Sequence, residues 1–222
     1  MASAREQILS KLPGAQPPSD SWREPFAPIS TLLPADRRRT LFAEKLAQNK
    51  ATFSEILSRK SIPSAVARHV ARQGYDGKVI VGQSLTALPW DIVDLDCNGV
   101  SEQHDLPLED GLMMVTDCFA AAAETGTIIT LSDRDHDSRL NFVARHHCVV
   151  LDEQDLVGPY EDVWVHMQNR QIPMPRAANF ITGPSRTADI EQTIELGAHG
   201  PASLHVILVR AQSSRVEPGE KR

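Results

Sequence analysis

The run Leu204-His205-Val206-Ile207-Leu208-Val209 decides the fold of this 222-residue chain. It is short and almost entirely apolar, and polar and apolar positions do not alternate along it. A strand with one face in water shows such alternation, so this run predicts a strand that is covered on both faces. Strands of this kind are typical of parallel or mixed sheets with helices on both sides.

Five further runs have the same character, and they are separated by polar segments long enough for helices or loops. They cover residues 78–82, 112–115, 128–131, 148–151 and 180–182. Together the runs predict an α/β fold with a central mixed, mostly parallel sheet of about six or seven strands, flanked by helices.

Helical spacing of apolar residues supplies the flanking helices. Phe42 and Leu46 begin a stripe that predicts one helix over about 35–57, and Gly74 ends a second helix that starts near residue 63. A third is expected to open at Pro159, since proline is favoured at a helix start. The interpretation divides the chain into an N-terminal helix and proline-rich arm (1–34), an α/β domain (35–212) and a polar tail (213–222).

Composition excludes several classes of function. The net charge is −6, from 23 basic and 29 acidic residues, and no basic stripe with interleaved aromatics suggests nucleic-acid binding. No leader segment and no apolar run long enough to cross a bilayer is recognised, so we expect a cytoplasmic protein without a membrane anchor.

Cysteine and glycine usage bears on cofactors. The chain has three scattered cysteines, which fits a reducing compartment and is one thiolate short of an ordinary iron–sulfur cluster. Gly82 stands alone after its strand, where a dinucleotide-binding turn has three glycines. The sequence therefore predicts no cofactor of its own.

The segment 183–191, Gly-Pro-Ser-Arg-Thr-Ala-Asp-Ile-Glu, is the strongest candidate for a ligand loop. It follows a predicted strand and is expected to lead into a short helix that ends at Gly197. Arg186 would oppose the dipole at the start of that helix unless it bound an anion or paired with a nearby acid. The hypothesis is an anion site formed by Gly183, Ser185, Arg186, Thr187 and Asp189; the structural alternative is a simple helix cap.

Two neighbouring motifs extend this candidate site. In Glu124-Thr125-Gly126-Thr127, Glu124 is interpreted as a pocket carboxylate, Thr125 as a hydroxyl donor and Gly126 as the turn. In 197–201, His199 is interpreted as a proton donor or hydrogen-bond partner. Each motif could equally be a structural junction. The candidate catalytic residues are Glu124, Asp189 and His199.

Two other polar segments are not interpreted as metal sites. The acidic stretch 133–137 lacks the glycine and terminal bidentate acid of a calcium loop. The pair His146-His147 next to Cys148 resembles a fragment of a zinc site, but adjacent side chains of a strand point apart. The sequence therefore predicts no metal centre.

The motifs at 124–127, 183–191 and 197–201, in this order and spacing, resemble those of the LUD-domain family of lactate-utilization proteins. The resemblance covers nearly the whole chain. It implies a fold similar to the NagB/RpiA/CoA-transferase superfamily and a role in the oxidation of L-lactate to pyruvate. It further implies that iron–sulfur proteins are the partners that carry the electrons, while this chain binds a small anionic or carboxylate ligand. A homodimer is compatible with this reading.

Other functions remain open from the sequence. A stand-alone CoA transferase of the same fold would need a glutamate nucleophile, for which Glu124 is the candidate. A cyclo-ligase would need a glycine-rich nucleotide loop, and the 12 glycines do not cluster in that way. A ligand-binding regulatory module without chemistry is the third alternative.

Overall fold

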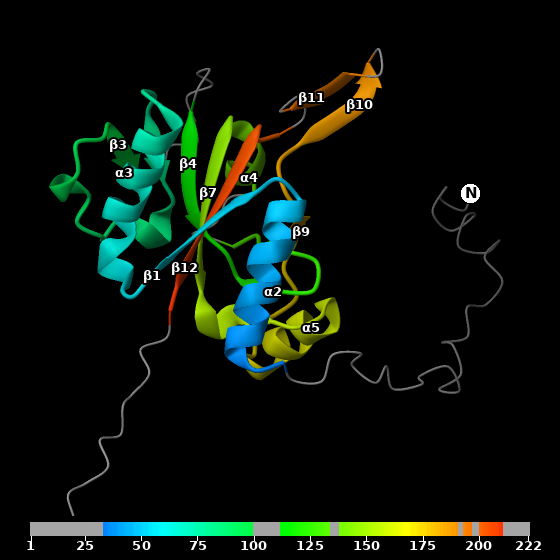
Figure 1. Cartoon of the computed structure of the whole chain (residues 1–222). Coiled ribbons are helices and arrows are strands. Elements are labelled where there is room, and N and C mark those ends of the chain that lie inside the picture. Colours follow the sequence, from blue (N-terminus) through cyan, green and yellow to red (C-terminus); the bar gives the residue numbers. More distant parts are fainter. Residues whose placement is uncertain (1–32, 100–111, 134–137, 191–192, 197–199, 211–222) are drawn as a thin grey trace, which may run out of the picture.

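Two sheets organise the computed structural model, which describes residues 33–99, 112–133, 138–190, 193–196 and 200–210 (Figure 1). The larger sheet has six strands in the order β1-β12-β7-β4-β2-β3, and every pair is parallel. Its strands are β1 (Thr52–Ile56), β2 (Val79–Val81), β3 (Cys97–Gly99), β4 (Met113–Asp117), β7 (His146–Asp152) and β12 (Ser203–Val209).

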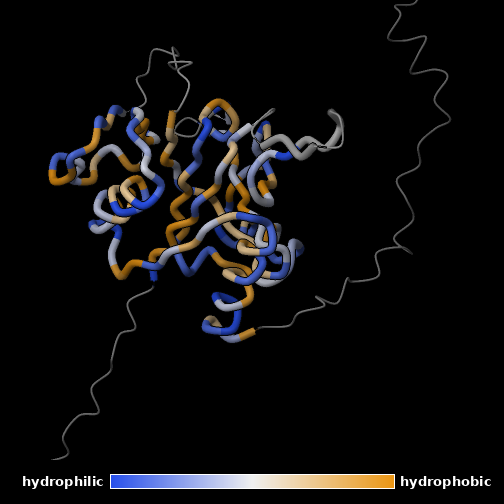
Figure 2. Tube along the Cα trace, turned by 45° about the horizontal axis from the view of Figure 1, so that its top comes forward, coloured by the Kyte–Doolittle hydropathy of each residue, from blue (hydrophilic) through white to orange (hydrophobic). Residues whose placement is uncertain are grey.

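Strand β12 lies between β1 and β7, and its apolar residues are buried on both faces of the sheet. Ile207 and Val209 pack in the cluster that includes helix α3 (Ile62–Gln73), while Val206 and Leu208 pack on the opposite side with α2 (Ala35–Gln48). Figure 2 shows hydrophobic residues along the strands at the middle of the molecule. This two-sided burial is what the unbroken apolar run predicts.

A second sheet of four strands has the order β8-β5-β6-β9. Its strands are β5 (Ala120–Ala122), β6 (Thr127–Leu131), β8 (Leu156–Val157) and β9 (Ala178–Ile181). Ala121 and Ile128 join the apolar cluster of α2 and the central sheet, whereas Ala122 and Ile129 face helix α5 (Tyr160–Asn169). The small sheet is thus a middle layer between the central sheet and α5.

The order of the central strands creates a point where the chain changes direction. From β2 the chain adds β3 on one side, and it then returns to add β4 on the other side of β2. Ligands in open parallel sheets bind outside the carboxyl ends of the strands at such a reversal. In this chain those ends are Gly82 after β2 and Asp117 at the end of β4.

Most of the predicted fold is confirmed. The structure has the α/β class, the central parallel sheet and helices on both faces, with α3 and α5 near their expected positions. The single helix predicted over 35–57 is wrong in its second half, because α2 ends at Gln48 and 52–56 forms β1. The apolar runs 128–131 and 180–182 do lie on strands, but in the small sheet.

The helix predicted after residue 185 is also wrong. Strands β10 (Arg186–Ile190) and β11 (Thr193–Leu196) pair as an antiparallel hairpin, which projects from the body of the molecule in Figure 1. Thr187 and Asp189 alternate with Ala188 and Ile190, and Thr193 and Ile194 follow on β11; threonine and isoleucine favour strands. Asp189 was interpreted as part of the first turn of a helix, but it lies on β10; Glu191, interpreted in the same way, lies outside the described residues.

Three histidines gather at the amino ends of the central strands. His69 of α3 stacks on His205 of β12 with ring centroids 3.9 Å apart. His205 is held between two hydroxyls, with Nδ1 2.7 Å from Thr52 Oγ1 and Nε2 3.0 Å from Ser54 Oγ. Burial, followed by the charges of His69 and Arg72, lowers the pKa of His205 to about 3. The pKa values of His69 and His146 are lowered as well, mainly by burial.

We expect acid to destabilise the fold through His205. The unfolded chain takes up a proton near the ordinary histidine pKa of 6.5, whereas the folded chain resists protonation down to about 3. The contribution of His205 is therefore complete above pH 6.5 and declines as the pH falls toward 3, by about 2 kcal/mol between pH 6.5 and 4.5. Urea unfolding at several pH values measures it.

The variant His205→Gln provides the matched comparison, since glutamine can contact the same hydroxyls and does not titrate. Its unfolding free energy should depend less steeply on pH between 6.5 and 4.5 than that of the unchanged chain. Equal slopes for the two proteins would contradict the assignment.

Candidate functional site

The two sequence motifs chosen as ligand loops meet at the C-terminal end of α2. Gly126, in the turn between β5 and β6, has a φ of +70°, and a Cβ there would lie 2.8 Å from Lys45 Cβ. Gly183, after β9, has a φ of +93°, and a Cβ there would lie 2.5 Å from the carbonyl oxygen of Asn49. Both contacts are too close for a side chain, so the last turn of α2 holds both loops through their glycines.

Arg186 and Asn49 reinforce this junction. The Arg186 guanidinium donates a hydrogen bond to the Asn49 carbonyl, and Asn49 Nδ2 donates to the Thr125 carbonyl at 2.9 Å. A cation at the C-terminal end of a helix is favoured by the helix dipole. The unfavourable position that suggested an anion partner for Arg186 therefore does not exist, and its charge has a structural partner.

Four hydroxyl groups cluster beside the junction. Thr127 Oγ1 lies 2.8 Å from Thr125 Oγ1, 2.7 Å from the Tyr160 hydroxyl and 2.7 Å from Thr182 Oγ1. Thr127 is buried, whereas Thr125 and Tyr160 are half-buried and Thr182 is exposed. Burial raises the pKa of Tyr160, but the three threonine hydroxyls together lower it below its ordinary value. The three outer hydroxyls retain capacity for a further hydrogen bond.

The other predicted site residues are distributed as follows. Glu124 is half-buried in the turn before β6, and its amide donates to the Gly158 carbonyl at 3.3 Å. The Ser185 amide donates to the Pro201 carbonyl at 2.8 Å, which ties the 183–187 loop to the start of β12. Thr187 and Asp189 lie on β10, with side chains outside the described residues, and His199 lies outside them altogether.

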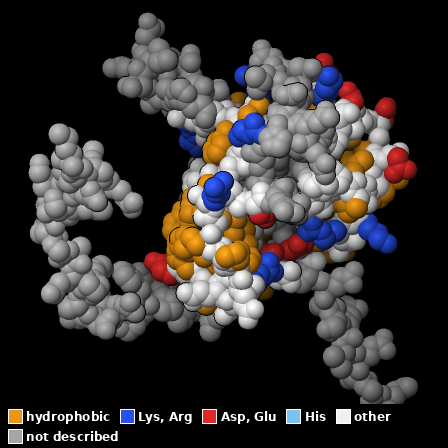
Figure 3. All heavy atoms as spheres, turned by 180° about the vertical axis from the view of Figure 1, so that it is seen from behind, with side chains coloured by type: hydrophobic (Ala, Val, Ile, Leu, Met, Phe, Trp, Pro, Cys, Tyr) orange, Lys and Arg blue, Asp and Glu red, His pale blue; other side chains and the backbone are white. Residues whose placement is uncertain are grey.

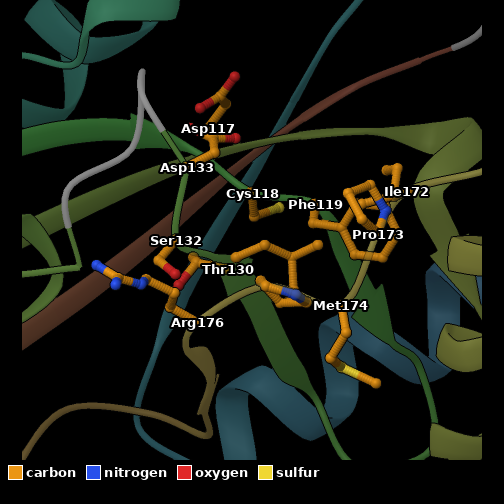
Figure 4. Close-up of a pocket in the computed structure, with 12 residues that line it drawn as sticks. Asp117, Cys118, Phe119, Thr130, Ser132, Asp133, Ile172, Pro173, Met174 and Arg176 are labelled. Carbon is orange, nitrogen blue, oxygen red and sulfur yellow. The ribbon is translucent and has the colours of Figure 1, made fainter.

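A pocket that the sequence did not predict lies at the other end of β6, beside the carboxyl end of β4 (Figure 4). Its volume is about 470 Å³. Three segments line it: 117–119 after β4, 130–133 at the end of β6, and 172–176 before β9. One signal could have revealed it, because Asp117 and Asp133 each stand two residues after the end of an apolar run, 112–115 and 128–131.

The wall of this pocket is fixed by hydrogen bonds within the chain. Thr130 Oγ1 accepts from the side-chain amides of Asn141 at 2.9 Å and Asn179 at 3.3 Å. Ser132 Oγ accepts from the Ala177 amide at 2.9 Å. These bonds join α4 (Leu140–Val143), β6 and β9, so the shape of the pocket is set by the fold.

Cys118 lines the pocket, but its surroundings do not suit a nucleophile. Burial, followed by the charges of Asp117 and Asp155, raises the pKa of its thiol well above the ordinary value. The nearby His166 contacts Asp155 at 3.0 Å, and Asp155 also accepts from Arg170 at 2.6 Å. A thiolate is the reactive form of cysteine, so this group is not poised for covalent catalysis.

The described residues contain neither a metal site nor a membrane-spanning helix. No group of three or more histidine, cysteine or acidic side chains in the described part of the chain is arranged to hold a metal ion. None of the helices among the described residues is long and apolar enough to span a bilayer.

Comparison with known proteins identifies the family of this chain. The family model for the LUD domain matches residues 39–209, which include both sheets and the junction at α2. The chain belongs to the LUD domain family. The matched range lies within the predicted α/β domain, 35–212.

Among curated proteins, lactate utilization protein C of Deinococcus radiodurans is 28% identical over 214 residues, covering 94% of this chain and 96% of that protein. The protein of the same name from Anoxybacillus flavithermus is 33% identical over 87 residues, and this match covers only 39% of each chain. That of Bacillus subtilis is 29% identical over 111 residues, with 49% of this chain and 46% of the relative covered.

A crystal structure of a DUF162 family protein from Deinococcus radiodurans has a similar fold. The TM-score is 0.62 at 22% identity, and the match covers 80% of this chain and 99% of the other. This likeness establishes the fold class independently of the sequence comparisons.

The junction at α2 predicts a large difference between two glycine substitutions. Gly183→Ala should reduce the unfolding free energy by at least ~2 kcal/mol, because the new Cβ would overlap the Asn49 carbonyl in addition to straining the backbone. Gly74→Ala is the control: its φ is +63°, but nothing lies within 4 Å of the added Cβ, so it should cost about 1 kcal/mol. Chemical denaturation measures both, and equal losses would contradict the close contact.

Proposed function

We propose that this protein is a non-redox component of a lactate-utilization system, which supports the oxidation of L-lactate to pyruvate together with iron–sulfur partner proteins. The observation that carries the proposal is the match along nearly the full length of lactate utilization protein C from Deinococcus radiodurans, within a LUD domain that spans residues 39–209. The partners accept the two electrons removed from lactate, and this chain contributes a binding site.

The proposed site for a small carboxylate or other small anion is the junction of the two loops. Thr125 and Ser185 are half-buried and offer hydroxyls beside the glycine turns. Arg186 uses one N–H on the Asn49 carbonyl, which leaves other guanidinium N–H groups able to donate to a carboxylate. The fold supports this proposal, because it brings Thr125 and Ser185 to the same junction although they are 60 residues apart in the chain. Glu124 is the proposed acid–base group at its edge.

We expect L-lactate, pyruvate or phosphate at millimolar concentration to raise the melting temperature of the protein. In Arg186→Ala the affinity should fall by ~1.5–3 kcal/mol, the scale of a charged hydrogen bond, which is roughly 10- to 150-fold. Arg186→Lys keeps the positive charge and should recover part of the loss. Arg68→Ala is the matched control. It changes an exposed residue of α3, on the opposite face of the central sheet, and this variant should bind the anion normally. A protein that no anion stabilises would rule out this site.

Reconstitution tests the wider role. The purified chain alone should not oxidise lactate with any dye acceptor, and activity should appear when the iron–sulfur partners are added. Glu124→Gln should lower the reconstituted rate without changing the melting temperature, whereas Glu161→Gln, an exposed change on α5, should not affect it. Lactate oxidation by the isolated chain would instead support a stand-alone enzyme.

A further inference from the structure

The pocket between β4 and β6 is separate from the junction at α2. Strand β6 begins at Thr127, inside the hydroxyl cluster, and ends at Leu131, in the wall of the pocket. At the rise of a β-strand these two residues are roughly 13 Å apart. The pocket also lies outside the carboxyl end of β4, next to the point where the strand order reverses, which is where open parallel sheets bind ligands.

The charges around the pocket disfavour a small anion. Asp117 and Asp133 place two carboxylates on one side, and Figure 4 shows them next to each other. Arg176 is the single cation among the lining residues, and in Figure 4 its side chain extends outward past Ser132. The lining therefore offers two carboxylates and one guanidinium, so it supplies no surplus of positive charge to hold lactate or phosphate.

The opposite wall is apolar. Phe119, Ile172 and Pro173 face the carboxylates across the pocket, and Met174, 73% exposed, stands at its edge. Trp164 of α5 and Phe180 of β9 are also exposed, and their rings contact each other. Figure 3 shows a hydrophobic area on the face of the molecule seen from behind. An aromatic ring and aliphatic side chains together form a surface on which a flat ring can pack.

The volume of the pocket also indicates a ligand larger than a small anion. Its volume of about 470 Å³ lies in the range of roughly 300–1,000 Å³ that is common for small-molecule sites. Lactate has only a handful of heavy atoms and would leave most of this space empty. The pocket therefore fits a molecule several times larger than the substrate of the proposed reaction.

We propose that this pocket is a second binding site, which takes a ring-containing ligand without net negative charge and with hydrogen-bond donors at one end. The ring packs on Phe119, Ile172 and Met174, and the donors reach Asp117 and Asp133. A cis-diol, as in a nucleoside, and an ammonium group both supply such donors. A carboxylate accepts several hydrogen bonds, so the ligand adds to the contacts these two aspartates already make.

Titration calorimetry of the full chain with a set of small probes tests this site. Adenosine and tryptamine carry a ring with a diol and with an ammonium group, respectively, and at least one of them should bind at micromolar to millimolar concentration. Loss of binding with 2′-deoxyadenosine identifies the diol as the recognised group, and binding of tryptamine alone identifies the ammonium. Adenosine monophosphate, which adds negative charge, should bind more weakly than adenosine, and L-lactate should not displace either probe.

Substitutions connect binding to the pocket. Asp133→Asn and Asp117→Asn should each lower the affinity for the probe about five- to thirtyfold. Asp133 is exposed, so its substitution should not affect folding. Met174→Ala should lower the affinity severalfold. Asp91→Asn, an exposed change outside the pocket, should bind normally and serves as the control. The proposal is overturned if neither ring probe binds at 5–10 mM (about the practical limit for a weak site), if adenosine monophosphate binds more tightly than adenosine, or if the aspartate substitutions leave binding unchanged.

Discussion

The close contact between two glycine turns and the last turn of α2 is the constraint on which the arrangement of this protein depends. Gly126 directly precedes β6 of the small sheet, and Gly183 lies just after β9, where the segment toward β12 begins, so both connections are fixed against one helix end. A methyl group at either position would push its loop away from the C-terminal end of α2. The hydroxyl cluster around Thr127 and the position of Arg186 both follow from this approach.

Sequence patterns predicted the class of the fold because the deciding residues are buried on both faces of a parallel sheet, and an unbroken apolar run such as 204–209 records that burial directly. They could not separate the helix α2 from β1, since Phe53 and Ile56 continue the helical spacing of Phe42 and Leu46 across the boundary. They also could not show that the runs 128–131 and 180–182 pair in a second sheet, because pairing depends on residues distant in the chain.

The candidate site was predictable only in part, for a related reason. Loops rich in glycine, hydroxyls and charge can be recognised in a sequence, and the structure does bring 124–127 and 183–186 together. The partner of a charge cannot be recognised in the same way: Arg186 contacts a backbone carbonyl at Asn49, 137 positions earlier. The pocket was missed because its three segments carry no shared motif. The protein thus has two distinct polar regions at opposite ends of β6, one of hydroxyls with a cation and one of carboxylates with an apolar wall.

The position of β12 in the sheet determines when the central sheet can form during synthesis. β1 pairs only with β12 in the central sheet, and β12 is the last strand of the described chain. On a ribosome, β1 and the edge of β7 have no partner strand until residues 203–209 are made, so the sheet closes only after every other strand of the described chain has been synthesised. Until then the edges of β1 and β7 are open to solvent and to other chains, and unpaired strand edges are sites of aggregation in incomplete chains. A premature stop a few codons before residue 203 would therefore release a chain in which β1 is separated from the other four strands of the main sheet.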